Sequence, residues 1–156
     1  IQDCCWDEKF SWELFTKFNM SNELSKRGKT NKRKGNNAER EYAEKFRQLG
    51  FTNCRTARQG AKLLDDCGID LIFIPFNVQI KAGKQIGMKP FKVLEYMKER
   101  ISSVLPKSSP EHNFPKIMIH RREVGQGNKR NEFSDIVSMT FEDFSKIIKL
   151  IEWKEV

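Results

Sequence analysis

The sequence predicts an α/β fold in which one mixed central β-sheet is flanked by helices. Helical periodicity alternates with short apolar strand patterns in the order helix, three strands, helix, two strands, helix, which is typical of helices packed on one sheet. The length of 156 residues corresponds to one domain. A chain of this length buries about 70% of its unfolded surface, so its core needs no disulfides.

Each predicted helix has an apolar stripe at helical spacing and a recognisable end. The first follows a cap at Asn36 or Asn37 and ends near Gln48, because Asn is a favoured N-cap residue. The second begins at Pro90, since proline is favoured in the first turn of a helix, and it ends before the next proline. The last follows Thr140, which forms a capping box with the acidic residue three positions later.

Runs of β-branched and other apolar residues, bounded by turn residues, predict five strands. They cover residues 51–56, 69–74, 78–82, 116–121 and 135–139. We expect the second and third of these to form an antiparallel hairpin. A turn of even length would place Asp70 opposite Lys81 and on the same face as Gln79, whereas a turn of odd length would put Asp70 on the other face.

The N-terminal part of the chain divides by composition. Residues 1–19 are expected to be an appendage, because Met20-Ser21-Asn22 resembles a translation start. Residues 20–35 are expected to form a basic flexible arm. The stretch from Lys26 to Gly35 holds six basic residues and neither an acidic nor an apolar one. Residues 36–156 then form the single folded domain.

Composition limits the classes of function. The net charge of +8, from 29 basic and 21 acidic residues, favours an anionic partner, and nucleic acid is the first candidate. A basic protein without such a partner would have the same composition. The four cysteines form no C-x-x-C pair, which argues against a zinc site and favours reduced thiols in the cytoplasm. No apolar run approaches the roughly 20 residues of a membrane helix, and no serine-hydrolase or P-loop motif is present.

Acidic and amide side chains occur at places where apolar residues are the rule. Glu39 lies at the edge of the first helix's apolar stripe, and Asp70 enters a hydrophobic strand. Gln79 and Lys81 share one face of the next strand. Two carboxylates and an amide oxygen would suit Mg²⁺, whose bound water can attack a phosphodiester, while Lys81 could stabilise the phosphate. A helix N-terminal acid and a structural Asp–Lys pair remain alternative interpretations.

The order of these residues resembles the PD-(D/E)xK nuclease signature, in which an acid on one strand is followed by acid-x-Lys on the next. The series Lys34-Gly35, Ala38-Glu39-Arg40-Glu41, Gly50-Phe51 and Arg55 is similar to the opening of archaeal-type Holliday-junction resolvases. This resemblance covers about residues 33–84. Gln79 stands where those resolvases have an acid, and Gln79-Ile80-Lys81 resembles the Gln-x-Lys variant of Mrr-type restriction nucleases.

The resemblance implies a restriction-endonuclease-like core and a metal-dependent DNA endonuclease. The catalytic residues would be Glu39, Asp70, Gln79 and Lys81. The first three would bind Mg²⁺, with Mn²⁺ as a substitute, and Lys81 would be the catalytic lysine. Arg40 and Arg55 would contact the scissile or a flanking phosphate. The full set of expected DNA-binding residues is Lys32, Arg33, Lys34, Arg40, Arg55 and Arg58.

We expect a structure-selective nuclease of the Holliday-junction-resolvase type, which acts on branched DNA in recombination or repair. A symmetric homodimer is expected, because a four-way junction needs two matched nicks. Two other functions stay open. One is a restriction-like or repair nuclease acting on duplex DNA. The other is a catalytically inactive nucleic-acid-binding module, which would need the basic arm but neither Glu39 nor Asp70.

Overall fold

The structure is a computed structural model that describes residues 8–83, 89–121 and 135–150, with side chains from residue 25 onward. The chain divides into two compact units, Ile1–Lys34 and Gly35–Val156. The expected appendage, residues 1–19, is described only from residue 8 onward. No helix in the described part of the chain is both long enough and apolar enough to cross a membrane.

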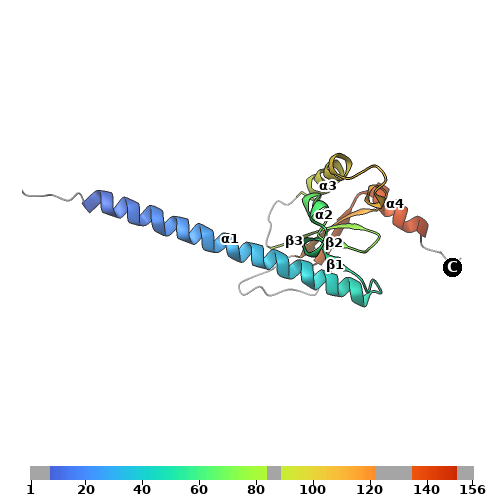
Figure 1. The fold of residues 1–156 in the computed structure, drawn as a ribbon, viewed down its shortest axis with the longest axis horizontal. Coiled ribbons are helices and arrows are strands. Elements are labelled where there is room, and N and C mark those ends of the chain that lie inside the picture. The colour runs from blue at the N-terminus through green and yellow to red at the C-terminus, as the bar shows by residue number, and fades with distance from the viewer. Residues whose placement is uncertain (1–7, 84–88, 122–134, 151–156) are drawn as a thin grey trace, which may run out of the picture. The chain divides into compact units, whose positions relative to one another are not determined.

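A long helix, α1, runs over Glu8–Gln48 (Figure 1). The expected helix start at Asn36 or Asn37 is therefore wrong, and residues 20–35 are helical where a flexible arm was expected. The physical reason lies in the composition. The stretch contains no proline, and its six Lys and Arg residues, together with Glu23 and Leu24, favour a helix. The two glycines oppose it by only about 1 kcal/mol each. Residues 25–33 are exposed all round the helix.

The second unit contains a mixed three-stranded sheet with the strand order β3-β4-β5. Strand β3 (Asn77–Ala82) pairs in parallel with β4 (Lys116–Arg121), and β4 pairs antiparallel with β5 (Asp135–Met139). Two short strands, β1 (Arg55–Thr56) and β2 (Leu71–Ile72), form a separate antiparallel pair. The predicted α/β class with a mixed sheet is thereby confirmed.

The remaining helices connect and cover these strands. Parallel strands need a crossover, and α3 (Pro90–Val104) supplies it between β3 and β4. A 3-10 turn, η1 (Ala57–Gln59), and a short helix, α2 (Lys62–Asp66), follow β1, and the sequence patterns did not predict either of them. A second 3-10 turn, η2 (Pro110–His112), precedes β4.

The C-terminal helix α4 (Phe141–Leu150) begins at the predicted capping box. The backbone N–H of Asp143 donates to the Thr140 hydroxyl at 3.2 Å, and that hydroxyl donates to the Asp143 carboxylate at 3.2 Å. Lys146 one turn later forms an ion pair with the same carboxylate at 2.9 Å. The reciprocal contacts satisfy groups that a helix N-terminus would otherwise leave without partners, so this predicted cap is confirmed.

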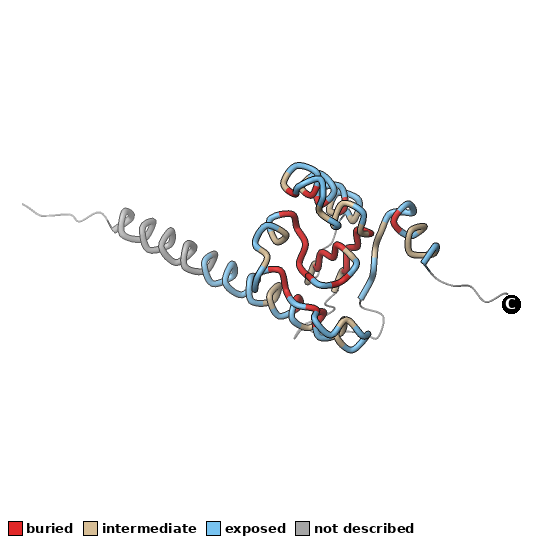
Figure 2. Tube along the Cα trace, turned by 45° about the vertical axis from the view of Figure 1, so that its right-hand side comes forward, coloured by how far each residue is buried: buried red, intermediate tan, exposed pale blue. Residues whose placement is uncertain are grey.

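The core has two parts, one on each side of the β3-β4 pair. On one side, the final turns of α1 pack through Ala38, Tyr42 and Ala43 against Val78 and Ile80 of β3. On the other side, the α3 residues Met97 and Ile101 pack with Cys67 and Ile69. The buried residues accordingly gather on the strands and on the helix faces turned toward them (Figure 2). Because side chains alternate along a strand, Gln79 and Lys81 lie on the face of β3 opposite to Val78 and Ile80.

The expected hairpin is wrong. Strand β2 pairs with β1, and β3 pairs with β4, so β2 and β3 do not share a ladder. The chain bends over residues 73–76, where exposed Phe73 adopts a φ of 63°. The backbone N–H of Asp70 donates to the Val78 carbonyl at 2.8 Å, so Asp70 lies beside Val78 rather than opposite Lys81. The longer bend, in place of a tight turn, is the reason for the shifted register.

Asn77 connects the start of β3 with the loop before β4 through side-chain hydrogen bonds. Its buried amide donates to the carbonyls of Glu111 at 2.7 Å and Phe114 at 3.3 Å. We expect Asn77→Ala to lower the free energy of unfolding by about 1–3 kcal/mol, because the buried Asn77 amide is lost and the partly buried Glu111 carbonyl loses its donor. Urea unfolding measures the change, and Asn113→Ala, at an exposed position in the same loop, is the matched control. An equal effect of the two substitutions would contradict this role.

Candidate active site

Glu39 is a buried carboxylate on the side of α1 that faces the core. Its neighbour Ala38 and the residues one turn later, Tyr42 and Ala43, are all buried in the core beside β3. The apolar stripe therefore draws Glu39 away from water. Burial raises the pKa of the Glu39 carboxyl above its ordinary value, and the positive charge of Arg58 opposes that rise.

Arg58 on η1 is the direct partner of Glu39. One terminal nitrogen of its guanidinium, Nη2, lies 2.8 Å from the Glu39 carboxylate. The other, Nη1, donates to the Asn36 side-chain oxygen at 2.6 Å. The third nitrogen, Nε, lies 3.7 Å from the Asp65 carboxylate of α2. One guanidinium therefore links α1, η1 and α2 around the buried carboxylate.

Asp70 occupies the short segment between α2 and β2 and is also buried. Its carboxylate accepts a hydrogen bond from the backbone N–H of Ile80 at 2.6 Å, and its own carbonyl accepts one from the N–H of Ala57 at 2.8 Å. The side chain thus takes the place of a missing strand partner on the edge of β3. These contacts fix Asp70 between η1 and the middle of β3.

Burial raises the pKa of the Asp70 carboxyl to about 7. The N–H of Ile80 opposes the rise, the negative charge of Glu39 adds to it, and the positive charges of Lys81 and Arg58 lower it. Asp70 is therefore within electrostatic reach of all three side chains. Among the predicted site residues, Glu39 and Lys81 thus lie close enough for their charges to act on Asp70, and so does Arg58.

Gln79 packs against Gly68. Gly68 has a φ of 79°, in the left-handed region that favours glycine. A side chain at position 68 would meet the Gln79 amide nitrogen, since a Cβ there would lie only 3.1 Å from it. The glycine therefore gives the buried Gln79 side chain its room beside the segment that carries Asp70. No sequence pattern identifies this role of Gly68.

A small hollow of about 100 Å³ opens beside Glu39. It is lined by Asn36, Glu39, Arg40, Thr56, Arg58 and Gln59. Arg40 and Arg58 are exposed at its rim, and Arg55 is exposed on β1. Of the expected DNA-binding residues, Arg40 and Arg58 thus line the hollow beside Glu39, and Arg55 does not. The other three, Lys32, Arg33 and Lys34, lie on α1 in the first unit.

The chemistry of the carboxylates fits a divalent cation. Both carboxyls have raised pKa values because they are buried, and their negative charges oppose each other. A cation between them would relieve both effects. Within the described ranges no three His, Cys, Asp or Glu side chains cluster in a way that could hold a metal, so any ligand beyond the two carboxylates would have to be an amide, a backbone carbonyl or water.

Two residues of the site were not predicted in their present roles. Asn36 was predicted only as a helix cap, although it lies three positions before Glu39, a spacing that places both on one side of a helix. Asp65 lies on α2, and a five-residue helix is too short to give a periodic pattern. Helical spacing could have identified the first residue, whereas no sequence signal identifies the second.

Comparison with models of known protein families, with curated proteins and with solved structures gives no significant match to this chain. The resemblance of residues 33–84 to PD-(D/E)xK nucleases therefore depends on the residues themselves and on the geometry they adopt.

The raised pKa of Asp70 predicts a specific dependence of stability on pH. Asp70 binds its proton more tightly in the folded chain, where its pKa is about 7, than in the unfolded chain, where it is near 3.8. Its contribution to the free energy of unfolding is therefore largest at low pH and falls as pH rises from about 4 to 7, by at most about 4 kcal/mol. Asp70→Asn carries no charge and lacks this dependence.

Urea unfolding of both proteins between pH 4 and 8 measures the effect. We expect the variant to gain stability relative to the wild type as pH rises through this range. Asp66→Asn, which removes a carboxylate from an exposed neighbouring position, is the control and should follow the wild-type curve. Parallel curves for wild type and Asp70→Asn would contradict the raised pKa.

Proposed function

We propose that this chain is a metal-dependent DNA endonuclease of the PD-(D/E)xK type, with a restriction-endonuclease-like core, that acts on branched DNA of the Holliday-junction kind. The observation that carries the proposal is the pair of buried carboxylates, Glu39 and Asp70, beside the strand that bears Lys81. Two carboxylates and a lysine are the groups that metal-assisted hydrolysis of a phosphodiester requires.

Each side chain has its own task in this proposal. Glu39 and Asp70, with the Gln79 amide oxygen, would hold Mg²⁺ or Mn²⁺, which supplies an activated water and polarises the phosphate. Lys81 would donate hydrogen bonds to the phosphate oxygens as negative charge develops on them. Asp70 must lose its proton before it can act as a ligand, and its pKa of about 7 sets that step near neutral pH.

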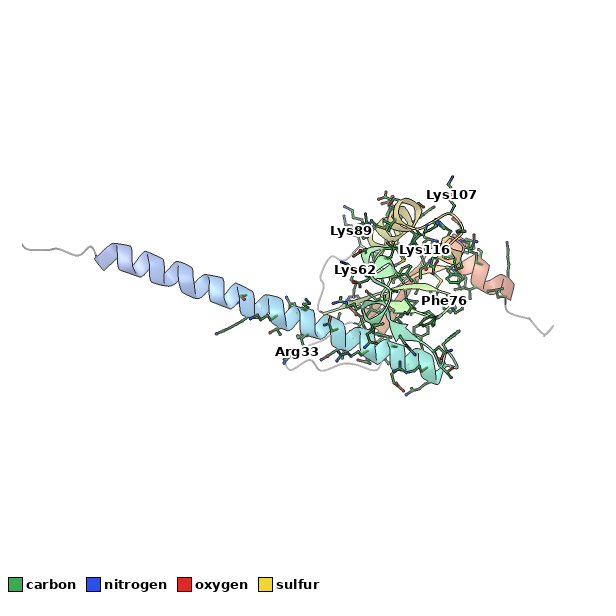
Figure 3. All side chains as sticks on the ribbon, in the orientation of Figure 1. Arg33, Lys62, Phe76, Lys89, Lys107 and Lys116 are labelled. Carbon is green, nitrogen blue, oxygen red and sulfur yellow. The ribbon has the colours of Figure 1, made fainter. Side chains whose placement is uncertain are left out.

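The basic side chains supply the contacts to DNA. Arg40 and Arg58 are exposed and line the hollow beside Glu39, and Arg55 is exposed on β1. In this proposal all three bind the scissile and flanking phosphates. In the first unit, α1 carries a further exposed group, Lys26, Arg27, Lys29, Lys32 and Arg33, with Lys34 partly buried. Figure 3 shows the side chain of Arg33 on the α1 ribbon. A homodimer belongs to the same proposal, since paired nicks on a junction need two matched sites.

One observation favours a different substrate and another favours loss of catalysis. The Gln79-Ile80-Lys81 sequence resembles the variant of Mrr-type nucleases, which favours a nuclease acting on duplex DNA. Within the described residues no three acidic side chains form a cluster suited to a metal, which favours an inactive nucleic-acid-binding module. A cleavage assay on four-way junction, flap, duplex and single-stranded DNA, with Mg²⁺ or Mn²⁺, separates all three functions.

The cleavage reaction should depend on Asp70. We expect Asp70→Asn to reduce cleavage by about 100-fold or more, because removal of a metal ligand takes away several kcal/mol of transition-state stabilisation. DNA binding should survive, since most phosphate contacts come from Lys and Arg. The control is Asp66→Asn at an exposed position, which should cleave normally. Wild-type cleavage by Asp70→Asn would contradict the assignment of the active site.

The basic group on α1 should set the salt dependence of DNA binding. Changing Lys26, Arg27, Lys29, Lys32 and Arg33 to Gln should flatten the slope of log affinity against log salt by up to about 0.9 for each phosphate that the variant no longer binds. The matched control changes five exposed lysines of the second unit, Lys89, Lys92, Lys98, Lys107 and Lys149. If both sets flatten the slope equally, binding follows net charge and α1 has no special role.

A further inference from the structure

The guanidinium of Arg58 uses all three of its nitrogen groups inside the candidate active site. They contact Glu39 at 2.8 Å, Asn36 at 2.6 Å and Asp65 at 3.7 Å. The side chain of Arg58 is nevertheless 41% exposed, whereas that of Glu39 is 5% exposed. The positive partner of a buried carboxylate therefore comes from the solvent side, on a 3-10 turn of three residues.

This position conflicts with a metal ion on the same carboxylate. A divalent cation bound through Glu39 Oε1 would compete with the Arg58 nitrogen that now contacts this oxygen, and one bound through Oε2 would share the single negative charge of the carboxylate with Arg58. The two positive charges would also repel each other at this short range, where little water separates them. Arg58 lies near Asp70 as well, since its charge lowers the pKa of that carboxyl. The guanidinium thus takes the place of a cation beside Glu39, while its effect on Asp70 is that of a nearby charge without a direct contact.

We propose, building on the function proposed above, that Arg58 is the resident counter-ion of the metal site: its guanidinium neutralises Glu39 until a divalent cation binds, then leaves the carboxylate and contacts a DNA phosphate. Arg58 is well suited to both positions. Its fork of donors matches a phosphate as well as it matches a carboxylate, and its partly exposed side chain can turn outward without unpacking the core.

This exchange couples the two ligands of the enzyme. A DNA phosphate that draws Arg58 away frees Glu39 for the metal, and a bound metal frees Arg58 for the phosphate. Each ligand must therefore tighten the binding of the other by the same factor. Arg58 acts on the metal only indirectly, through its contact with Glu39. The affinity for the metal in the absence of DNA is therefore the first quantity to measure.

The experiment is calorimetric titration of the full chain with Mg²⁺ in the absence of DNA. We expect Arg58→Gln to bind Mg²⁺ about tenfold more tightly than the wild type, because the competing cation is gone. The matched control is Arg40→Gln. The charge of Arg40 also acts on Glu39 and Arg40 lines the same hollow, but within the described residues it forms no ion pair with that carboxylate. Its effect should be clearly smaller.

A second variant and a second measurement distinguish the counter-ion role from an effect of misfolding. Arg58→Lys keeps a positive charge, but one ammonium group cannot bridge Asn36, Glu39 and Asp65, so its affinity for Mg²⁺ should lie between those of wild type and Arg58→Gln. The Arg58 Nε–H signal in a nitrogen-15 NMR spectrum, assigned by its absence in Arg58→Gln, should move when Mg²⁺ is added to the wild type. Thermal unfolding checks that each variant is folded.

The outcomes separate this inference from the proposed function. If wild type binds Mg²⁺, Asp70→Asn abolishes binding, and Arg58→Gln does not exceed Arg40→Gln, the metal site stands and the counter-ion role is overturned. A stationary Nε–H signal on binding also overturns it. If no variant binds Mg²⁺ in a manner that depends on Asp70, the proposed metal site fails, and the counter-ion role fails with it.

Discussion

The hydrogen bond from the Ile80 N–H to the Asp70 carboxylate joins two parts of the second unit that the β-ladders leave separate. The β1-β2 pair and the β3-β4-β5 sheet share no ladder, and Asp70 links them through this 2.6 Å contact and through the bond from its own N–H to Val78. Because the carboxylate must stay at the edge of β3 to keep this bond, it is held close to Lys81. The proposed chemistry and the integrity of the fold therefore depend on the same side chain.

A buried carboxylate in such a position is costly, and the surrounding residues offset that cost only in part. Burial and the neighbouring charge of Glu39 raise the pKa of Asp70, while Lys81, Arg58 and one backbone N–H lower it. The net result is a carboxyl that still has a pKa of about 7. A carboxylate with a purely structural role stabilises the folded chain most at neutral pH when it is fully paired, and full pairing lowers its pKa. Incomplete neutralisation of two adjacent buried carboxylates is instead typical of functional sites.

Periodicity and capping residues predicted the elements that are bounded by strong local signals. Strands β4 and β5 have the predicted bounds, and α3 and α4 begin at the predicted proline and capping box. The predictions are wrong where tertiary contacts, rather than local sequence, determine the structure. The register of Asp70 follows from a bend at Phe73 and from a side chain that replaces a strand partner. No pattern of alternating residues encodes either feature, so the face that Asp70 presents could not be derived from spacing alone.

The residue types of the site were easier to predict than their pairing. Glu39, Asp70 and Lys81 were singled out because charged residues interrupt apolar patterns. The ion pair of Glu39 with Arg58 depends on how a 3-10 turn packs against α1, which local sequence does not determine. The extended helix α1 has a similar cause. Its basic segment lacks an apolar face, so periodicity gives no signal there, although its composition permits a helix.

The amide at position 79 gives these charges their balance. With Gln79 the site holds the carboxylates of Glu39, Asp65 and Asp70 against the positive charges of Arg40, Arg58 and Lys81, so the two signs are formally equal in number before any metal binds. A carboxylate at position 79 would leave an excess of negative charge. The buried Gln79 beside Gly68 therefore lets the chain fold with its own cations in place. A divalent cation entering the site would add positive charge to this balance, and Arg58, which pairs with Glu39 and is 41% exposed, is the cation that it would displace in our proposal.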